Sequence, residues 1–413
     1  MVQWHFDMLD ETPYHRETYR SGSNQVDVKQ FNERLILDIV ATNGSLSKAD
    51  ITRIIGLSPQ TVTTIVNRLI GEGLLKKGDM IKGKIGQPST LIELNNDGAT
   101  AIGIKIGRRS ADILLVGLAN KIAEKYSLSY AYPNAGTLFE WIGDTVSTVI
   151  HQLSHSQRQK LIGIGVATPF KLDGWEGVIN APKGEMSKWK DIDVIHEIER
   201  LTSQRTFLLN DATAACLAEL RVSSKKQTMS FLYFYVGTFL GGGIVLDGKI
   251  YNGSNGNAGS VGSLPTSISI GPKPDQMVNT AAIHKLESMC ITAGLPRDTF
   301  DLDEPLSQQA ETLFNRWSND AGNALAYAII SGQSFFDLNE IVIDGSIKRD
   351  LLERLIDKVE SSFTRYDMQG ITVPSVRAGS LGNDARAIGG SVLPFHEQFG
   401  LDQSLILRPG RGG

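Results

Sequence analysis

Two segments of the chain share one order of expected elements, and this repeat constrains the fold more than any other feature. Each segment begins with a strand, a glycine-rich turn and a second strand, and each continues into helices and further strands. The first strand pair covers residues 101–106 and 113–117, and the second covers 231–236 and 244–246. Such an order, occurring twice, predicts two related α/β lobes with a cleft between them.

Hydrophobic periodicity places the other elements of these lobes. We expect helices over 138–153, 193–202, 310–332 and 350–363, and strands over 161–166, 207–209 and 341–343. A further helix is expected to open directly after strand 207–209. The body of the protein is therefore expected to span residues 96–413, with the boundary between its lobes near residue 225.

The turns of both strand pairs are rich in glycine, which lets backbone N–H groups approach an anion closely. The candidate phosphate-contacting residues are Gly107, Gly237, Thr238, Gly241 and Gly242. Tight β-turns explain such glycines at least as often, so the pattern alone leaves both interpretations open.

Asn210 and Asp211 stand at an expected junction between a strand and a helix. A carboxylate at a helix start above a cleft can accept a hydrogen bond from a ligand hydroxyl or act as its base. The alternative is that the pair only caps the helix.

The N-terminal part has a different pattern, that of three short helices. Apolar residues recur at helical spacing from Phe31 to Asn43. Ser47 is placed to cap a second helix that stops at Gly56, and Ser58, followed by a proline at the first helical position, opens a third that ends near residue 71. Two strands, 74–78 and 90–94, follow around a Lys- and Gly-containing tip. We predict an arm over 1–27 and a winged helix-turn-helix over 28–95.

The third helix of this module carries polar residues opposite its apolar stripe, and the segment 53–90 has six basic residues against Glu72 and Asp79. Hydroxyl, amide and guanidinium groups suit base edges and phosphates, and a basic wing suits a minor groove. The predicted DNA-contacting residues are Ser58, Gln60, Thr61, Thr63, Thr64, Asn67 and Arg68 on the helix side, with Lys82, Lys84 and Gln87 on the wing. The alternative is a small helical dimerisation module.

Composition excludes several classes of protein. The 413 residues include 41 Lys and Arg against 45 Asp and Glu, a net charge of −4, with 41% hydrophobic residues, which is ordinary globular usage. Cys216 and Cys290 lie far apart in the chain, so we expect buried, reduced thiols and no disulfide framework. No apolar run approaches the ~20 residues of a membrane span, and the first residues do not form a secretory signal. A cytoplasmic protein without a membrane partner is expected.

Seven segments, taken in order, resemble the ROK family, which joins sugar kinases and sugar-responsive repressors on an actin-like, hexokinase-like two-lobed fold. They are 101–107, 163–169, 180–182 with 189–191, 209–212, 237–250, 255–263 and 381–390. The resemblance runs from about Gln30 to Leu393, and the N-terminal winged helix is similar to that of the repressor branch. It implies an α/β body of two lobes. It also implies ligand contacts at Asn180, Lys183, Asn210, Asp211, Ser260 and Ser263, with Asp211 as a vestige of the family's catalytic base.

The chain differs from the family's kinases at the positions of their metal-serving and sugar-binding residues. Lys105 stands where the kinases' first hairpin has the aspartate that serves Mg²⁺ and phosphate, and no acidic residue close by in the sequence offers a substitute. Ser260 and Ser263 replace the family's sugar-binding glutamate and the histidine that joins its sugar and zinc sites. Residues 264–289 contain no cysteine, so the family's zinc cluster has no counterpart. We expect no kinase activity, no metal and no cofactor.

The resemblance thus implies a transcriptional regulator, most simply a repressor, that binds double-stranded operator DNA as a homodimer or homotetramer. Its degenerate kinase body would sense a sugar or sugar-like effector. Two alternatives stay open: a body that responds only to a protein partner, and an active ATP-dependent sugar kinase with a fused DNA-binding domain.

Overall fold

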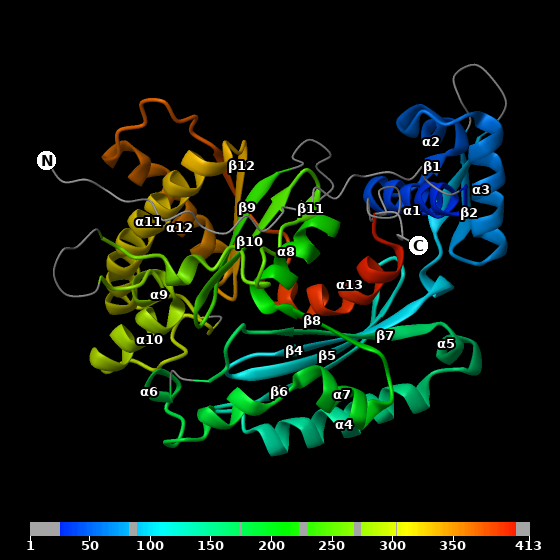
Figure 1. Ribbon diagram of the computed structural model, residues 1–413. Coiled ribbons are helices and arrows are strands. Elements are labelled where there is room, and N and C mark those ends of the chain that lie inside the picture. Colours follow the sequence, from blue (N-terminus) through cyan, green and yellow to red (C-terminus); the bar gives the residue numbers. More distant parts are fainter. Residues whose placement is uncertain are drawn as a thin grey trace, which may run out of the picture.

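The computed structural model describes residues 25–81, 89–173, 176–222, 230–267, 274–302 and 304–401. A small, mostly helical module lies beside a larger body in which two sheets face each other across a pair of helices (Figure 1). The expected arm up to residue 24, the wing tip with Lys82, Lys84 and Gln87, and the lobe boundary near 225 lie outside the described residues. No helix in the described part of the chain combines the length and the apolar character needed to cross a membrane.

The small module has the expected helix-turn-helix with a two-stranded wing. Its elements are α1 (Gln25–Asn43), β1 (Leu46–Ser47), α2 (Lys48–Ile55), α3 (Pro59–Gly71), β2 (Leu75–Ile81) and β3 (Ser89–Leu94). The three strands form one sheet in the order β1-β3-β2. The apolar stripe of α3, Val62, Ile65, Val66 and Leu69, is buried against α1.

The caps that define this motif are confirmed. The Ser47 hydroxyl accepts the Asp50 N–H, and the Ser58 hydroxyl accepts the Thr61 N–H at 3.2 Å. Gly56 ends α2 at φ 70°, a left-handed conformation that glycine adopts without steric cost. The helix α1 begins at Gln25, within the last residues of the segment 1–27 that we expected as an arm. Its first turns hold few apolar residues, so hydrophobic periodicity gave no signal there.

The body contains two five-stranded sheets with the same topology. The first has the order β6-β5-β4-β7-β8 and the second the order β11-β10-β9-β12-β13. In each, a central strand pairs antiparallel with a hairpin partner on one side and parallel with a later strand on the other. The two predicted α/β lobes are therefore confirmed, and they are topological copies.

The strands of the first sheet are β4 (Thr100–Ile106), β5 (Ser110–Gly117), β6 (Ile122–Ser129), β7 (Leu161–Thr168) and β8 (Thr206–Asn210). Those of the second are β9 (Phe231–Val236), β10 (Leu240–Leu246), β11 (Lys249–Ile250), β12 (Glu340–Gly345) and β13 (Ser375–Ala378). The edge strand β6 was not predicted. Its residues alternate between exposed and half-buried positions, so it has no apolar run.

Helices cover the outer face of each sheet. On the first lobe these are α4 (Ala135–Gln152), α6 (Glu176–Ile179) and α7 (Val194–Thr202), while the short α5 (His155–Gln159) buries no residue. On the second they are α9 (Val278–Ala281), α10 (Ile283–Thr292), α11 (Gln308–Phe336) and α12 (Arg349–Ser362). The largest hydrophobic core lies under this second group, around Trp317, Phe314 and the buried Cys290.

Two helices, α8 (Asp211–Val222) and α13 (Ala385–Phe399), lie between the sheets (Figure 1). The helix α8 follows a first-lobe strand but packs on β10 of the second lobe, with Cys216 buried in that contact. The helix α13 follows the second lobe but packs on β4 and β7 of the first. Each lobe is therefore covered on its inner face by a helix from the other.

Glycines allow this crossing. A Cβ at Gly241 or Gly243 would lie 2.6 Å from the Cβ of Ala212 or Cys216 on α8. A Cβ at Gly389 would overlap the carbonyl oxygen of Ala214, where α13 crosses α8. Gly241, Gly242 and Gly243 lie within β10, whereas Gly237 lies in the turn between β9 and β10. Close packing therefore explains Gly241 and Gly243 without a phosphate.

Candidate functional site

A cavity of about 260 Å³ opens between the lobes at the point where α8 and α13 begin. The β4–β5 turn and the first residues of α8 line it from one lobe. The β9–β10 turn, the loop 257–263 and Arg386 of α13 complete it. Elements from both lobes therefore meet at one site. The repeat in the sequence had predicted a cleft between the lobes, and this cavity lies there.

The structure brings together most of the residues predicted for ligand and phosphate contacts. Those that line the cavity are Asn210, Asp211, Ser260, Ser263, Gly107, Thr238, Gly241 and Gly242. Asn180 and Lys183 do not line it and are exposed on a separate segment, and Gly237 lies just outside it. The resemblance placed Asn180 and Lys183 by motif, and their role in ligand binding stays a prediction.

Asn210 caps α8, as the structural alternative proposed. Its side-chain oxygen accepts the N–H groups of Ala212 at 3.0 Å and Thr213 at 3.3 Å. The Asp211 carboxylate does not cap and lies 3.4 Å from the Arg386 guanidinium. The guanidinium also lies over the Tyr235 ring, 4.7 Å from its centroid. Asp211 is therefore already paired in this structure.

Lys105 is almost fully buried, at 2% exposure, and its ammonium has two partners. It donates to Ser110 Oγ at 2.7 Å and to Asp112 Oδ2 at 2.8 Å. The expectation that no nearby acidic residue offers a substitute did not consider Asp112. Asp112 lies on the neighbouring strand β5, directly opposite Lys105 in the pairing register. Burial, with a contribution from the charge of Arg386, lowers the pKa of Lys105 to about 8.

The β4–β5 turn reaches across to the second lobe through two arginines. The Arg108 guanidinium stacks on Phe239, 4.1 Å from the ring centroid, and donates to the Lys171 carbonyl at 3.1 Å. Arg109 pairs with Glu287 of α10 at 3.0 Å. Burial lowers the pKa of Arg108 to about 10. These contacts join the two lobes at the entrance of the cavity.

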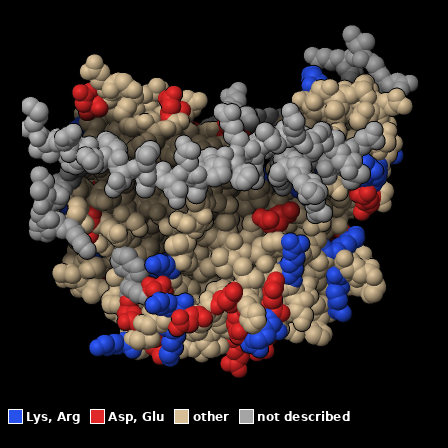
Figure 2. All heavy atoms as spheres, in the orientation of Figure 1, with Lys and Arg blue, Asp and Glu red and all other residues tan. Residues whose placement is uncertain are grey.

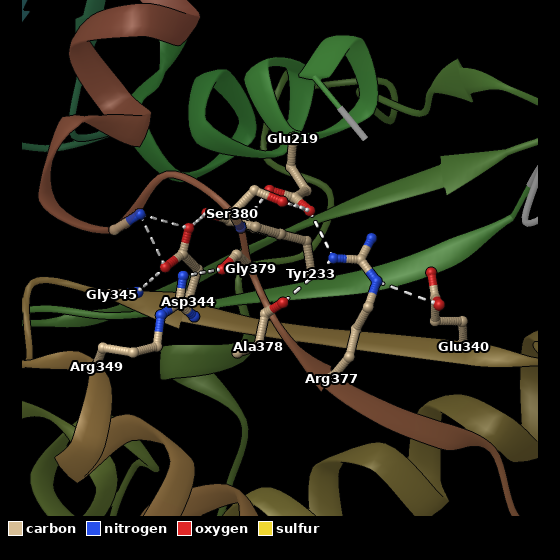
Figure 3. Close-up of polar contacts among 11 residues, drawn as sticks. Glu219, Tyr233, Glu340, Asp344, Gly345, Arg349, Arg377, Ala378, Gly379 and Ser380 are labelled. Carbon is tan, nitrogen blue, oxygen red and sulfur yellow. Dashed lines mark hydrogen bonds and ion pairs between the residues drawn. The ribbon is translucent and has the colours of Figure 1, made fainter. Parts of the chain in front are cut away.

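A buried polar network joins α8 to β13 of the second lobe and to the segment that follows it (Figure 3). Glu219 of α8 is fully buried and pairs with Arg377 at 2.6 Å, and it accepts the Ser380 N–H at 2.8 Å. Asp344, also fully buried, accepts from Tyr233 and from the N–H groups of Gly345 and Gly382. Because each buried carboxylate is satisfied, α8 is firmly seated on this lobe.

The same two helices contact the small module at their other ends. Arg221, in the last turn of α8, pairs with Asp38 of α1 at 2.6 Å and lies 3.1 Å from His396 Nδ1 of α13. Arg34 of α1 donates to the Gly400 carbonyl, and Phe399 packs on the module's core. Thus α8 and α13 both run from the cavity to the helix-turn-helix.

On the module, Gln60, Thr63, Thr64 and Asn67 of α3 are exposed, together with Ser58 before it. Arg68 is placed differently from our expectation, because its guanidinium lies against Glu33 of α1 and Glu72. Asn67 accepts a hydrogen bond from Lys48 of α2 at 2.8 Å. The exposed face of α3 is therefore mainly hydroxyl and amide.

Two cavity residues, Arg108 and Arg386, were not identified from the sequence as ligand contacts. Arg386 lies 175 positions from its partner Asp211, so no local pattern could have joined them. The described residues include no group of three or more His, Cys, Asp or Glu side chains that could hold a metal ion.

Comparison with known proteins matches both parts of the chain. The ROK family model matches residues 101–396, and a winged helix-turn-helix DNA-binding model matches residues 32–76. Protein y4fQ of Sinorhizobium fredii is 26% identical over 89% of this chain and 91% of its own length. The xylose repressor of Caldicellulosiruptor bescii is 27% identical over 58% of this chain, and the match spans 59% of that protein.

Among solved structures, a ROK family transcriptional regulator described as a homologue of the Escherichia coli MLC protein superposes with a TM-score of 0.62. The match covers 92% of this chain and 99% of that one, at 19% identity. At this identity the likeness concerns the fold, and it extends over both the module and the body.

Proposed function

Because the chain belongs to the ROK family and begins its described part with a winged helix-turn-helix, we propose that it is a DNA-binding transcriptional regulator, a repressor, whose two-lobed body binds a sugar or sugar derivative. A regulator of this kind acts where the DNA is, so the proposal includes a cytoplasmic location. The named relative described above, a xylose repressor, supports the proposal.

The observation that carries the proposal is the path of α8 and α13. Both helices begin at the interlobe cavity, with Asp211 and Arg386, and both end on α1 of the helix-turn-helix, with Arg221 and His396. A ligand that draws the lobes together changes the angle between these helices, because each is packed on a different lobe. The change reaches α1 directly, and α1 packs against the DNA-facing helix α3.

Operator recognition is assigned to the exposed groups of α3: Gln60, Thr63, Thr64 and Asn67, with Ser58 and Thr61 at its start. Lys82, Lys84 and Gln87 would add wing contacts. A dimer would present two such helices about 34–36 Å apart, one turn of DNA. Light scattering of the protein alone and with DNA tests whether it is a dimer or a tetramer.

We extend the proposal to the absence of kinase activity. Lys105 stands where the family's kinases serve Mg²⁺, and its only described carboxylate partner, Asp112, is held by Lys105 itself and by Ser127. Asp211, the residue in the place of the base, is paired with Arg386. A positioned metal and a free base are both needed for phosphoryl transfer.

Three measurements on the full chain test this function. Selection from a random duplex pool should enrich one operator sequence with two-fold symmetry. A sugar panel should contain a compound that changes the affinity for that operator. A coupled assay with ATP, Mg²⁺ and hexoses should show no turnover above background. Failure to enrich any sequence would contradict the regulator, whereas Mg²⁺-dependent phosphorylation lost in Asp211→Ala would establish the kinase alternative. If no small molecule changes the affinity for the operator, the protein-partner alternative is favoured.

A further inference from the structure

The ionisable residues that line the cavity are mostly basic. Lys105, Arg108, Arg109, Lys171 and Arg386 face it, against the single carboxylate of Asp211. The chain as a whole carries a net charge of −4. On the face shown in Figure 2, basic and acidic side chains are interspersed over the lower part of the body. The excess of cations is therefore a property of the cavity and not of the whole protein.

Some of these cations are neutralised by their own partners. Lys105 is paired with Asp112, and Arg109 with Glu287. Arg386 is paired with Asp211, but at 3.4 Å, which is long for a charge-assisted hydrogen bond. Its buried Nε has no hydrogen-bond partner among the described residues.

Arg108 differs from the others because it forms no ion pair with any carboxylate that the structure describes. Its recorded contacts are the Lys171 carbonyl and the face of Phe239. Stacking on a ring leaves the edge of a guanidinium free to donate two parallel hydrogen bonds. The charge of Asp211 offsets the burial of this cation only in part, and an anion in the cavity would lower the remaining cost.

The cavity is also lined by groups of another kind. Ser260, Ser263 and Asp211 offer hydroxyl and carboxylate groups, which suit the hydroxyls of a sugar. The cavity volume, about 260 Å³, lies slightly below the range of pockets for drug-sized ligands, which begins at roughly 300 Å³. A single monosaccharide unit is the appropriate size.

We propose that the ligand of this cavity is an anionic sugar derivative, whose phosphate or carboxylate group is bound by Arg108 and Arg386 and whose hydroxyls meet Asp211, Ser260 and Ser263. The inference rests on the proposed function, because it names the class of ligand that the regulator's body takes. The oxyanion displaces Asp211 from Arg386, so the carboxylate becomes free to accept a sugar hydroxyl. Phosphate esters and sugar acids share this chemistry.

The test uses titration calorimetry of the full chain with matched sets of aldoses. Each set contains the neutral sugar, its terminal phosphate ester and its uronic acid, and inorganic phosphate is a separate probe. At least one anionic member should bind ten or more times more tightly than its neutral parent, with an affinity that falls as salt is raised. The ester and the acid arms identify which oxyanion is preferred.

Arg108→Gln should weaken the binding of that anion at least tenfold, and Arg108→Lys should weaken it less. Arg200→Gln, on the exposed helix α7, is the matched control and should leave the affinity within twofold. The melting temperature of each unliganded variant shows whether it folds, and Arg108→Lys keeps the test usable if Arg108→Gln does not.

The proposal is overturned if no anion binds, if a neutral sugar binds as tightly as its anionic forms, or if the anion's affinity survives Arg108→Gln. Binding of ATP without any sugar anion would also overturn it. These results can be distinguished from a failure of the proposed function. If the protein selects an operator and a neutral sugar releases it from that DNA, the proposed regulator is supported and only the anionic ligand is contradicted.

Discussion

Asp211 and Arg221 occupy opposite ends of the same helix, α8, about 15 Å apart along its axis. Asp211 lines the interlobe cavity, and Arg221 pairs with Asp38 of the helix-turn-helix module at 2.6 Å. Glu219 fixes the helix to the second lobe between these two contacts. The helix is therefore a rigid connection between the proposed ligand site and the proposed DNA-binding module.

Arg221→Ala should uncouple the two sites without destroying either. The variant loses the Asp38 ion pair and the contact with His396, so movement of α8 is no longer transmitted to α1. We expect the ligand-induced change in operator affinity to fall at least fivefold, while ligand affinity stays within twofold. Fluorescence anisotropy of labelled operator, with and without the ligand, measures both. An unchanged response in Arg221→Ala would show that the signal takes another route.

Arg68→Ala should destabilise the helix-turn-helix. Its guanidinium lies against Glu33, whose side chain is 13% exposed, so truncation leaves that carboxylate largely buried without its partner. A loss of about 1–3 kcal/mol is expected. Hydrogen exchange of the α1 and α3 amides should report the loss locally. By contrast, Gln60→Ala should weaken operator binding with exchange unchanged. A change of base preference in Arg68→Ala, with exchange intact, would instead make Arg68 a base-reading residue.

His396→Gln should make the free energy of unfolding decrease less steeply as the solution becomes more acidic. Burial, with a contribution from Arg221, lowers the pKa of His396 to about 4 from an ordinary 6.5. The unfolded chain therefore binds the proton more readily, and stability is lost as pH falls from about 6.5 towards 4. This residue accounts for roughly 2–3 kcal/mol of that loss. Urea unfolding at pH 7, 5.5 and 4.5 measures it, and equal profiles for variant and parent would contradict the assignment.

Gly389→Ala should strongly destabilise the body. The added Cβ would overlap the Ala214 carbonyl at the crossing of α13 and α8. Because backbone on both sides must move, we expect a loss of at least about 2 kcal/mol. Gly177→Ala is the control, since no atom lies within 4 Å of its added Cβ. Thermal unfolding of the two variants compares them, and a Gly389→Ala protein as stable as its parent would show that the crossing is loosely packed.

The sequence by itself determined the elements that depend on neighbouring residues. The caps at Ser47 and Ser58, the apolar stripe of α3 and the repeated hairpins are local patterns, and the structure confirms each. The winged helix-turn-helix and the two α/β lobes could be recognised for that reason. Asn210 is another local case, because its position alone raised the helix cap as one of two interpretations, and the structure shows that cap.

Only the tertiary structure decided which distant side chains meet. Lys105 received its partner from the strand pairing that brings Asp112 opposite it, and Arg386 reached Asp211 because α13 crosses α8 between the lobes. Arg68 was turned towards Glu33 by the packing of α3 on α1, while Asn180 and Lys183 are exposed and outside the cavity lining. Helical periodicity and capping are set within a few residues, whereas ion pairs across a cleft are set by the packing of whole lobes, which no local pattern encodes.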